Sequence, residues 1–145
     1  MKKMRGVAMV EFAIVASVLM TLLFACLEFG RVTYTFSALN EGTRRAARLA
    51  AVCPINDPKI AAAVNFMGAY GFNASNVSVN YLDSDGAALS GTPVLVSVYY
   101  VQVSVVGYTM PLAIPFVSPT LTSPSFTVTL PAESLGVSNT GSAAC

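Results

Sequence analysis

The sequence contains no histidine in its 145 residues. This absence excludes Ser-His-Asp and Cys-His catalytic arrangements, and metal sites that need an imidazole ligand. The glycines are scattered, and none of them forms a phosphate-binding motif. Eight basic residues stand against 7 acidic ones, and no basic patch indicates nucleic acid as a partner. We therefore expect no catalytic residue, no cofactor and no metal ion, and a protein that is not an enzyme.

Charged residues are also scarce, at 10% of the chain, whereas hydrophobic residues reach 54%. The stretch from Phe12 to Leu27 carries no charge at all. Such a run is typical of a transmembrane helix, so the sequence predicts a membrane-attached protein. Lys2, Lys3 and Arg5 precede the run. By the positive-inside rule, they predict a single crossing with a cytoplasmic N-terminus.

Proline is absent before Pro54, and only Gly30 and Gly42 interrupt the preceding residues 7–52. This pattern predicts one continuous helix over 7–52, about 70 Å long and more than twice as long as the bilayer hydrocarbon is thick. The membrane part would be about residues 7–30. The remainder predicts an amphipathic helix. Its apolar stripe consists of Val32, Phe36, Leu39, Ala46, Leu49 and Ala50.

A single carboxylate, Glu11, stands at the head of the apolar run, five residues after Gly6. A charge inside a bilayer costs about 2.5–3.5 kcal/mol, and it is rarely left there without a partner. The alternative is that Glu11 lies at headgroup depth, where an acid suits the positive end of the helix dipole.

Three motifs carry a resemblance to a known family: Arg5-Gly-Val-Ala-Met-Val-Glu-Phe-Ala, Leu27-Glu-Phe-Gly-Arg31 and Glu41-Gly-Thr-Arg-Arg-Ala-Ala-Arg48. Together they resemble the TadE-like pseudopilins of tight-adherence (Tad, type IVc) pilus systems. The spacing of Gly6 and Glu11, with an aromatic residue at position 12, is similar to a class III prepilin signal.

The resemblance implies a processing site between Gly6 and Val7, where a prepilin peptidase would remove residues 1–6 as a leader. It also implies that Glu11 pairs with the free N-terminal amine of a neighbouring subunit. The function implied is that of a minor pilin required for assembly or priming of a Tad pilus used in adhesion and surface attachment. The implied partners are other pilin and pseudopilin subunits, the peptidase, an inner-membrane assembly platform and membrane lipid.

The resemblance further implies a bacterial inner-membrane protein whose residues 53–145 form a periplasmic α+β domain, or one exposed on the extracellular filament. Helical spacing predicts a short helix over Lys59–Tyr70, and Asp83-Ser-Asp-Gly86 predicts a turn. Period-two alternation predicts strands over 77–81, 92–108 and 126–130. Met110–Pro124, with four prolines, predicts an irregular loop. We expect a pilin-like fold in which the long helix covers an antiparallel sheet of three or four strands.

The three cysteines have different settings. Cys26 falls in the predicted span and is expected to be a small apolar filler. Cys53 and Cys145 both fall on the far side of the membrane, where an oxidising compartment would let them pair. Two free thiols are the alternative.

Two other interpretations stay open at this point. Leu23-Phe-Ala-Cys26 resembles a lipobox, so the protein would be a lipoprotein acylated at Cys26. Phe24 is bulky for that motif, and helical sequence continues past Cys26. The other interpretation is an exported domain of different function held by an uncut signal anchor. The first residue of the mature protein differs between the three hypotheses.

Overall fold

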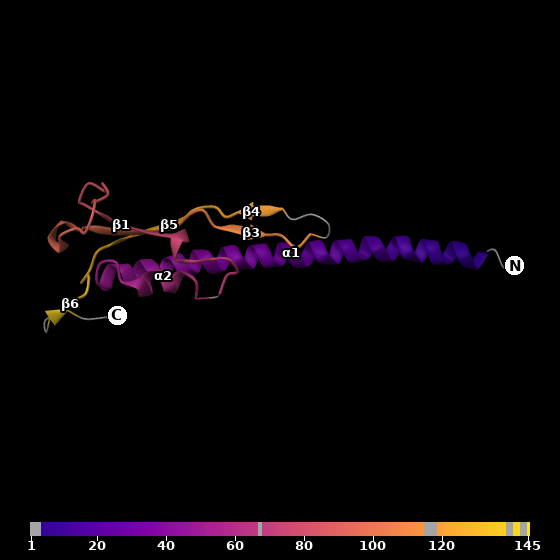
Figure 1. The fold of residues 1–145 in the computed structure, drawn as a ribbon, viewed down its shortest axis with the longest axis horizontal. Helices are drawn as coiled ribbons and strands as arrows, with labels where there is room; N and C mark the ends of the chain where they lie inside the picture. Colours follow the sequence, from indigo (N-terminus) through magenta and orange to yellow (C-terminus); the bar gives the residue numbers. More distant parts are fainter. Residues whose placement is uncertain (1–3, 67, 115–118, 139–140, 143–144) are drawn as a thin grey trace. The chain divides into compact units, whose positions relative to one another are not determined.

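The computed structural model describes residues 4–66, 68–114, 119–138, 141–142 and 145 (Figure 1). Residues 1–3 of the predicted leader, including Lys2 and Lys3, lie outside this set. The described residues form two α-helices and two short 3-10 helices: α1 (Met4–Val52), α2 (Pro58–Val64), η1 (Ala74–Asn76) and η2 (Leu95–Ser97). They also form seven strands: β1 (Val77–Leu82), β2 (Tyr100–Val105), β3 (Thr109–Pro111), β4 (Thr120–Thr122), β5 (Phe126–Pro131), β6 (Val137–Ser138) and β7 (Gly141–Ser142).

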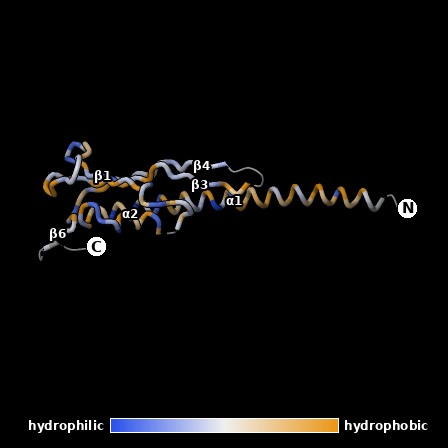
Figure 2. Tube along the Cα trace, in the orientation of Figure 1, coloured by the Kyte–Doolittle hydropathy of each residue, from blue (hydrophilic) through white to orange (hydrophobic). Residues whose placement is uncertain are grey.

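The helix α1 covers the whole of the predicted helix 7–52 without a break. The chain divides into two compact units between Tyr34 and Thr35, so that α1 contributes to both. The described part of the first unit is the N-terminal stretch of α1 alone. Figure 2 shows that this stretch is dominated by hydrophobic residues, whereas hydrophilic residues appear in α1 beyond it.

The second unit is built on a three-stranded antiparallel sheet in the order β1-β2-β5. The central strand β2 pairs Val103 with Val79 on one side and with Val128 on the other. Val101, Val103 and Val105 are essentially inaccessible to solvent because alternate residues of a strand point to one face. The predicted α+β class, with a long N-terminal helix and a small antiparallel sheet, is therefore confirmed.

The C-terminal part of α1 packs on this sheet and on α2. Phe36 meets Phe126 of β5 edge to face, with ring centroids 6.2 Å apart. The predicted stripe is only partly right: Leu39, Ala46 and Ala50 are buried, but Val32, Phe36 and Leu49 are only half-buried. The buried face also includes small residues that the stripe omitted, namely Gly42, Thr43, Ala47 and Ala51. Small side chains let the sheet and α2 approach the helix backbone closely.

Three predicted elements need correction. The helix expected over Lys59–Tyr70 is the shorter α2, which begins after the Asp57 N-cap and ends at Val64. The strand expected over 92–108 is regular only in β2, and η2 precedes it. Met110–Pro124 is not wholly irregular, since β3 and β4 pair Met110 with Leu121 inside it. Residues 115–118 of that segment lie outside the described set.

The break after α1 is fixed by a tyrosine from the sheet. The hydroxyl oxygen of Tyr81 accepts a hydrogen bond of 3.0 Å from the backbone N–H of Asn56, which has a positive φ of 62°. Tyr81 is buried, and its burial raises the pKa of the phenol above the ordinary 10.0, with a smaller contribution from the nearby Asp57 carboxylate. This contact holds the turn between α1 and α2 against β1.

Candidate processing and assembly site

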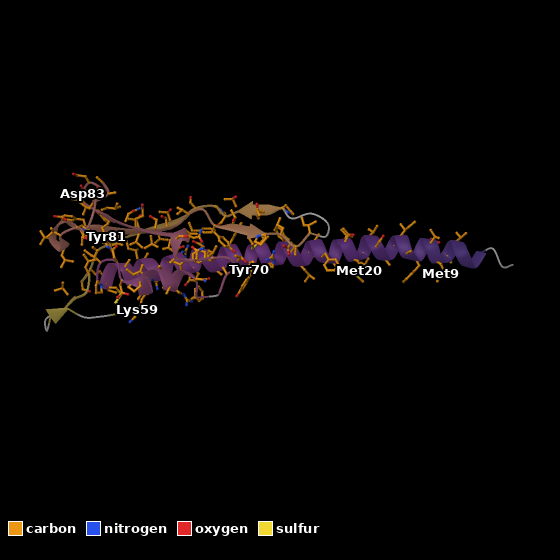
Figure 3. The ribbon with its side chains drawn as sticks, in the orientation of Figure 1. Met9, Met20, Lys59, Tyr70, Tyr81 and Asp83 are labelled. Atoms are coloured by element: carbon orange, nitrogen blue, oxygen red, sulfur yellow. A yellow bond between two sulfur atoms is a disulfide. The ribbon has the colours of Figure 1, made fainter. Side chains whose placement is uncertain are left out.

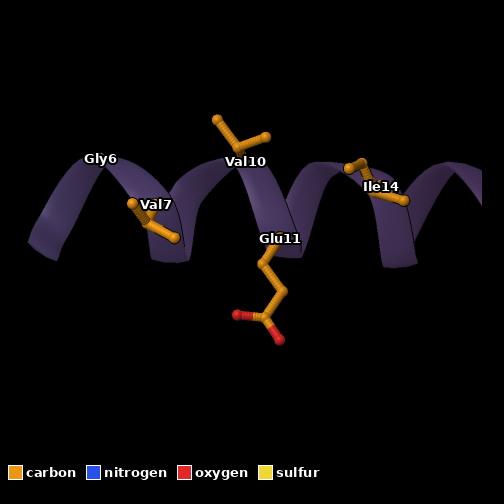
Figure 4. A pocket seen from close by; sticks show the side chains of 5 residues that line it. All are labelled: Gly6, Val7, Val10, Glu11 and Ile14. Atoms are coloured by element: carbon orange, nitrogen blue, oxygen red, sulfur yellow. The ribbon is translucent and has the colours of Figure 1, made fainter.

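The predicted processing site lies on the first turns of α1. Gly6, Val7, Val10, Glu11 and Ile14 line a shallow, open depression on this one helix (Figure 4). Val7 and Glu11 are four residues apart, so they lie one turn apart on the same side of the helix. A β-carbon placed on Gly6 would meet no atom within 4 Å, and both Gly6 and Val7 are exposed.

Glu11 extends away from the helix in Figure 4. Among the residues that the structure describes, no side chain forms an ion pair or hydrogen bond with its carboxylate. Its neighbours on the depression are apolar, namely Val7, Val10 and Ile14. An ionised carboxylate on such a surface is costly in a bilayer unless another molecule or the chain end supplies a cation.

The apolar segment that follows is exposed along its length. Phe12 exposes 71% of its surface, and Leu27 and Phe29 expose 70% and 71%. The helix is long and apolar enough to cross a membrane. So many apolar side chains would not remain in contact with water. Lipid or neighbouring apolar helices would cover them. This segment is consistent with a membrane anchor.

An ion pair that the sequence reasoning missed lies at the end of this segment. Arg31 donates from both Nε and Nη2 to the Glu28 carboxylate, and the Nε–Oε2 distance is 3.1 Å. The two side chains are three residues apart on α1 and so occupy the same face. The i, i+3 spacing of Glu28 and Arg31 in the sequence was the available signal for this pair. The pair balances two charges that lie close to the apolar stretch.

The basic residues of the second unit are arranged differently. Arg45 pairs with Glu41 at 3.2 Å, as the i, i+4 spacing predicts, and its guanidinium carbon lies 4.0 Å from the centre of the Phe66 ring. Arg44 and Arg48 are exposed, and neither forms an ion pair with an acid among the described residues. The Glu41–Arg45 pair is exposed on both sides, so it contributes only a few tenths of a kcal/mol.

The C-terminal segment closes the end of α1. Glu133 N–H donates to the Ala51 carbonyl at 2.9 Å, Gly136 N–H donates to the Val52 carbonyl at 2.6 Å, and the Ser134 hydroxyl also donates to Val52. These donors satisfy carbonyls that a helix C-terminus otherwise leaves unpaired. A disulfide joins Cys53 to Cys145, 92 residues away. The end of the chain is thus tied to the residue that follows α1.

The structure also places Cys26, on which the lipoprotein interpretation depends. Cys26 is a free, exposed cysteine inside an unbroken helix, and no flexible linker follows it before Val52. Cleavage before Cys26 would have to cut through the middle of α1.

Within the described ranges, no group of three or more histidine, cysteine or acidic residues is placed to hold a metal ion.

The fold and this helix together define an α+β protein with one N-terminal helix long and apolar enough for a membrane span. The model of a family described as TadE-like protein matches residues 6–48, all within α1. This match confirms the TadE-like resemblance over those residues. None of the curated proteins and none of the solved structures compared with the chain matches it.

Proposed function

We propose that the protein is a structural minor pilin or pseudopilin. It is made as a precursor, cut between Gly6 and Val7 by a prepilin peptidase, and assembled through α1 into a Tad-type pilus or its priming complex. The observation that carries this proposal is Glu11: a carboxylate without a partner among the described residues, one turn from Val7 on an exposed apolar helix. Cleavage after Gly6 creates a free amine at Val7, which is the cation that such a carboxylate needs.

In this account the protein has no catalytic activity. Its apolar segment resides in the bacterial inner membrane before assembly, with the N-terminus cytoplasmic and residues 53–145 periplasmic. Its partners are the peptidase, the assembly platform, lipid and other pilin-like subunits, whose apolar helices would cover the exposed side chains of residues 7–29. Charge pairing between Glu11 and the amine of an adjacent subunit would favour subunits in the correct axial register, because an unpaired charge is costly in a low-dielectric setting.

A pair of glycine variants tests the proposal. Gly6→Leu puts a bulky side chain at the cut bond, and Gly30→Ala adds a β-carbon elsewhere on α1 where nothing lies within 4 Å. Each variant replaces the native protein in the source bacterium, and both chain mass and surface pili are measured. We expect Gly6→Leu to keep residues 1–6 and to lose pili, with Gly30→Ala unchanged. Normal piliation by an uncut Gly6→Leu protein would refute the proposal.

A further inference from the structure

The connection between β1 and β2 carries an exposed apolar surface at the edge of the second unit. It comprises residues 83–99, and its two ends meet where Tyr99 N–H donates to the Leu82 carbonyl at 2.9 Å. Val94, Val96 and Tyr99 expose 73%, 89% and 55% of their surfaces. We call this connection, with its exposed Val94, Val96 and Tyr99 and its exposed Asp85, the apolar-acidic loop. Folding leaves these large side chains in water, which is typical of a surface that binds another protein.

The acids of this connection have different roles. The Oδ1 atom of Asp83 accepts hydrogen bonds from the backbone N–H groups of Asp85 and Ala87, at 2.9 and 2.8 Å. Asp83 therefore holds the turn. Asp85 contributes only its backbone there, and its exposed carboxylate forms no ion pair with any described base. The loop thus combines exposed apolar side chains with one carboxylate that is available to a partner.

A surface of complementary character lies elsewhere on the same unit. Arg44 and Arg48 stand one turn apart on the exposed face of α1, and Phe66, beside Arg45, exposes 40% of its surface. We call Arg44, Arg48 and Phe66 the basic face. Both arginines lack an acidic partner among the described residues. Exposed guanidinium groups and an exposed aromatic ring on the same unit suit a partner that offers a carboxylate and apolar side chains.

We propose that the apolar-acidic loop of one copy binds the basic face of a second copy of this chain. The argument for this occupant is that the two surfaces are complementary in charge and that both are partly apolar. In Figure 3, Asp83 of this connection and Lys59 of α2 lie on opposite sides of α1. Such a head-to-tail contact uses different surfaces on each copy and can repeat from copy to copy.

Cysteine cross-linking in membranes tests the contact without altering the charges involved. Two full-length copies with different tags are co-expressed in a Cys26→Ser background, one with Ser84→Cys in the loop and one with Asn40→Cys, one turn before Arg44. A bismaleimide should link the two tags. The matched control replaces Ser84→Cys by Thr127→Cys, on the exposed side of β5. A Ser84–Asn40 product no stronger than the Thr127–Asn40 control would overturn the proposal.

A charge swap tests the same contact independently. Asp85→Arg in every copy should reduce the cross-linked product several-fold, as should Arg44→Asp with Arg48→Asp. Combining all three changes in one chain should restore much of the cross-linked product. The loop is then basic and the helix face acidic, so the two surfaces still attract each other. Unchanged cross-linking in the single-sided variants would overturn the proposal. Peptidase cleavage after Gly6 is measured in the same samples, so failure of this contact is distinguishable from failure of the proposed function.

Discussion

Gly42 of α1 lies directly against the backbone of Val64 at the end of α2. A β-carbon at position 42 would fall 2.1 Å from the Val64 carbonyl oxygen and 2.9 Å from its carbonyl carbon. Because the obstacle is backbone rather than a mobile side chain, the two helices would have to separate. Glycine at this position is therefore what permits α2 to dock on α1.

Gly42→Ala should consequently destabilise the second unit by about 1–3 kcal/mol, the usual cost of overpacking a close contact. Gly30→Ala is the matched control, since nothing lies within 4 Å of a β-carbon there, and alanine favours a helix more than glycine does. The free energy of unfolding of both full-length variants in detergent measures the difference. Equal stability of Gly42→Ala and the native protein would contradict the packing described here.

The raised pKa of the Tyr81 phenol predicts that the stability of the protein depends on pH. Burial raises its pKa above 10.0, so the folded protein keeps the phenol proton to a higher pH than the unfolded chain does. The resulting stabilisation is fully present below about pH 10 and is lost as the pH rises through the raised pKa. Unfolding free energies measured between pH 8 and about 11 should show this loss.

Tyr81→Phe should remove that alkaline dependence and also cost about 1–2 kcal/mol at neutral pH, because the Asn56 N–H loses its acceptor. Tyr70→Phe is the control, since the Tyr70 side chain is 76% exposed and the Tyr108 hydroxyl donates to the Tyr70 backbone carbonyl, which this substitution keeps. An alkaline stability profile identical in Tyr81→Phe and the native protein would refute the assignment.

The disulfide between the chain end and the residue after α1 predicts that Cys145→Ser strongly lowers the free energy of unfolding. Breaking the Cys53–Cys145 bond opens a loop of 92 residues, which on chain-entropy arguments costs about 4–5 kcal/mol. Cys26→Ser removes a cysteine that is in no disulfide and should leave the unfolding free energy within about 0.5 kcal/mol. Reductant should lower the stability of the native protein and of Cys26→Ser, but not that of Cys145→Ser. A native protein insensitive to reductant would argue against this bond.

Glu11→Ala should leave membrane insertion intact and impair pilus assembly. Removing a carboxylate from an apolar helix makes insertion easier, while the predicted charge pair with a neighbouring subunit is lost. Ser17→Ala is the control on the same segment, since the Ser17 hydroxyl already donates to the Ile14 carbonyl at 2.8 Å. Membrane fractionation and counts of surface pili measure both steps. Normal pilus output from Glu11→Ala would exclude the role assigned to Glu11.

The sequence predicted the features that depend on local pattern. The lack of proline before Pro54 and the apolar run predicted the long helix, and strict alternation predicted β1 and β5 almost to the residue. The segment before β2 was missed because Leu95–Ser97 belongs to a short apolar run whose pattern fits a strand as well as a turn of 3-10 helix. In the structure, the backbone N–H and the hydroxyl of Ser97 both donate to the Val94 carbonyl, which closes the turn.

Other features depend on partners distant in the sequence. β3 and β4 form across a proline-rich stretch because Pro111 ends its strand, where a missing N–H is tolerated. The buried face of α1 includes Thr43 and Ala47 because α2 and the sheet both approach that helix. The hydrophobicity pattern of α1 alone does not predict this approach. At the candidate site, sequence marked Gly6, Val7 and Glu11 through family resemblance, whereas the Glu28–Arg31 pair emerged only from the structure.

The most direct test of the central claim is the N-terminal residue of the mature protein, determined by intact mass and peptide mapping on material from its native membranes. A chain that starts at Val7 is the result we predict, since it places the free amine one turn from Glu11. A chain that starts at an acylated Cys26 would identify a lipoprotein instead. A chain that retains Met1 in cells with an active prepilin peptidase would contradict the account.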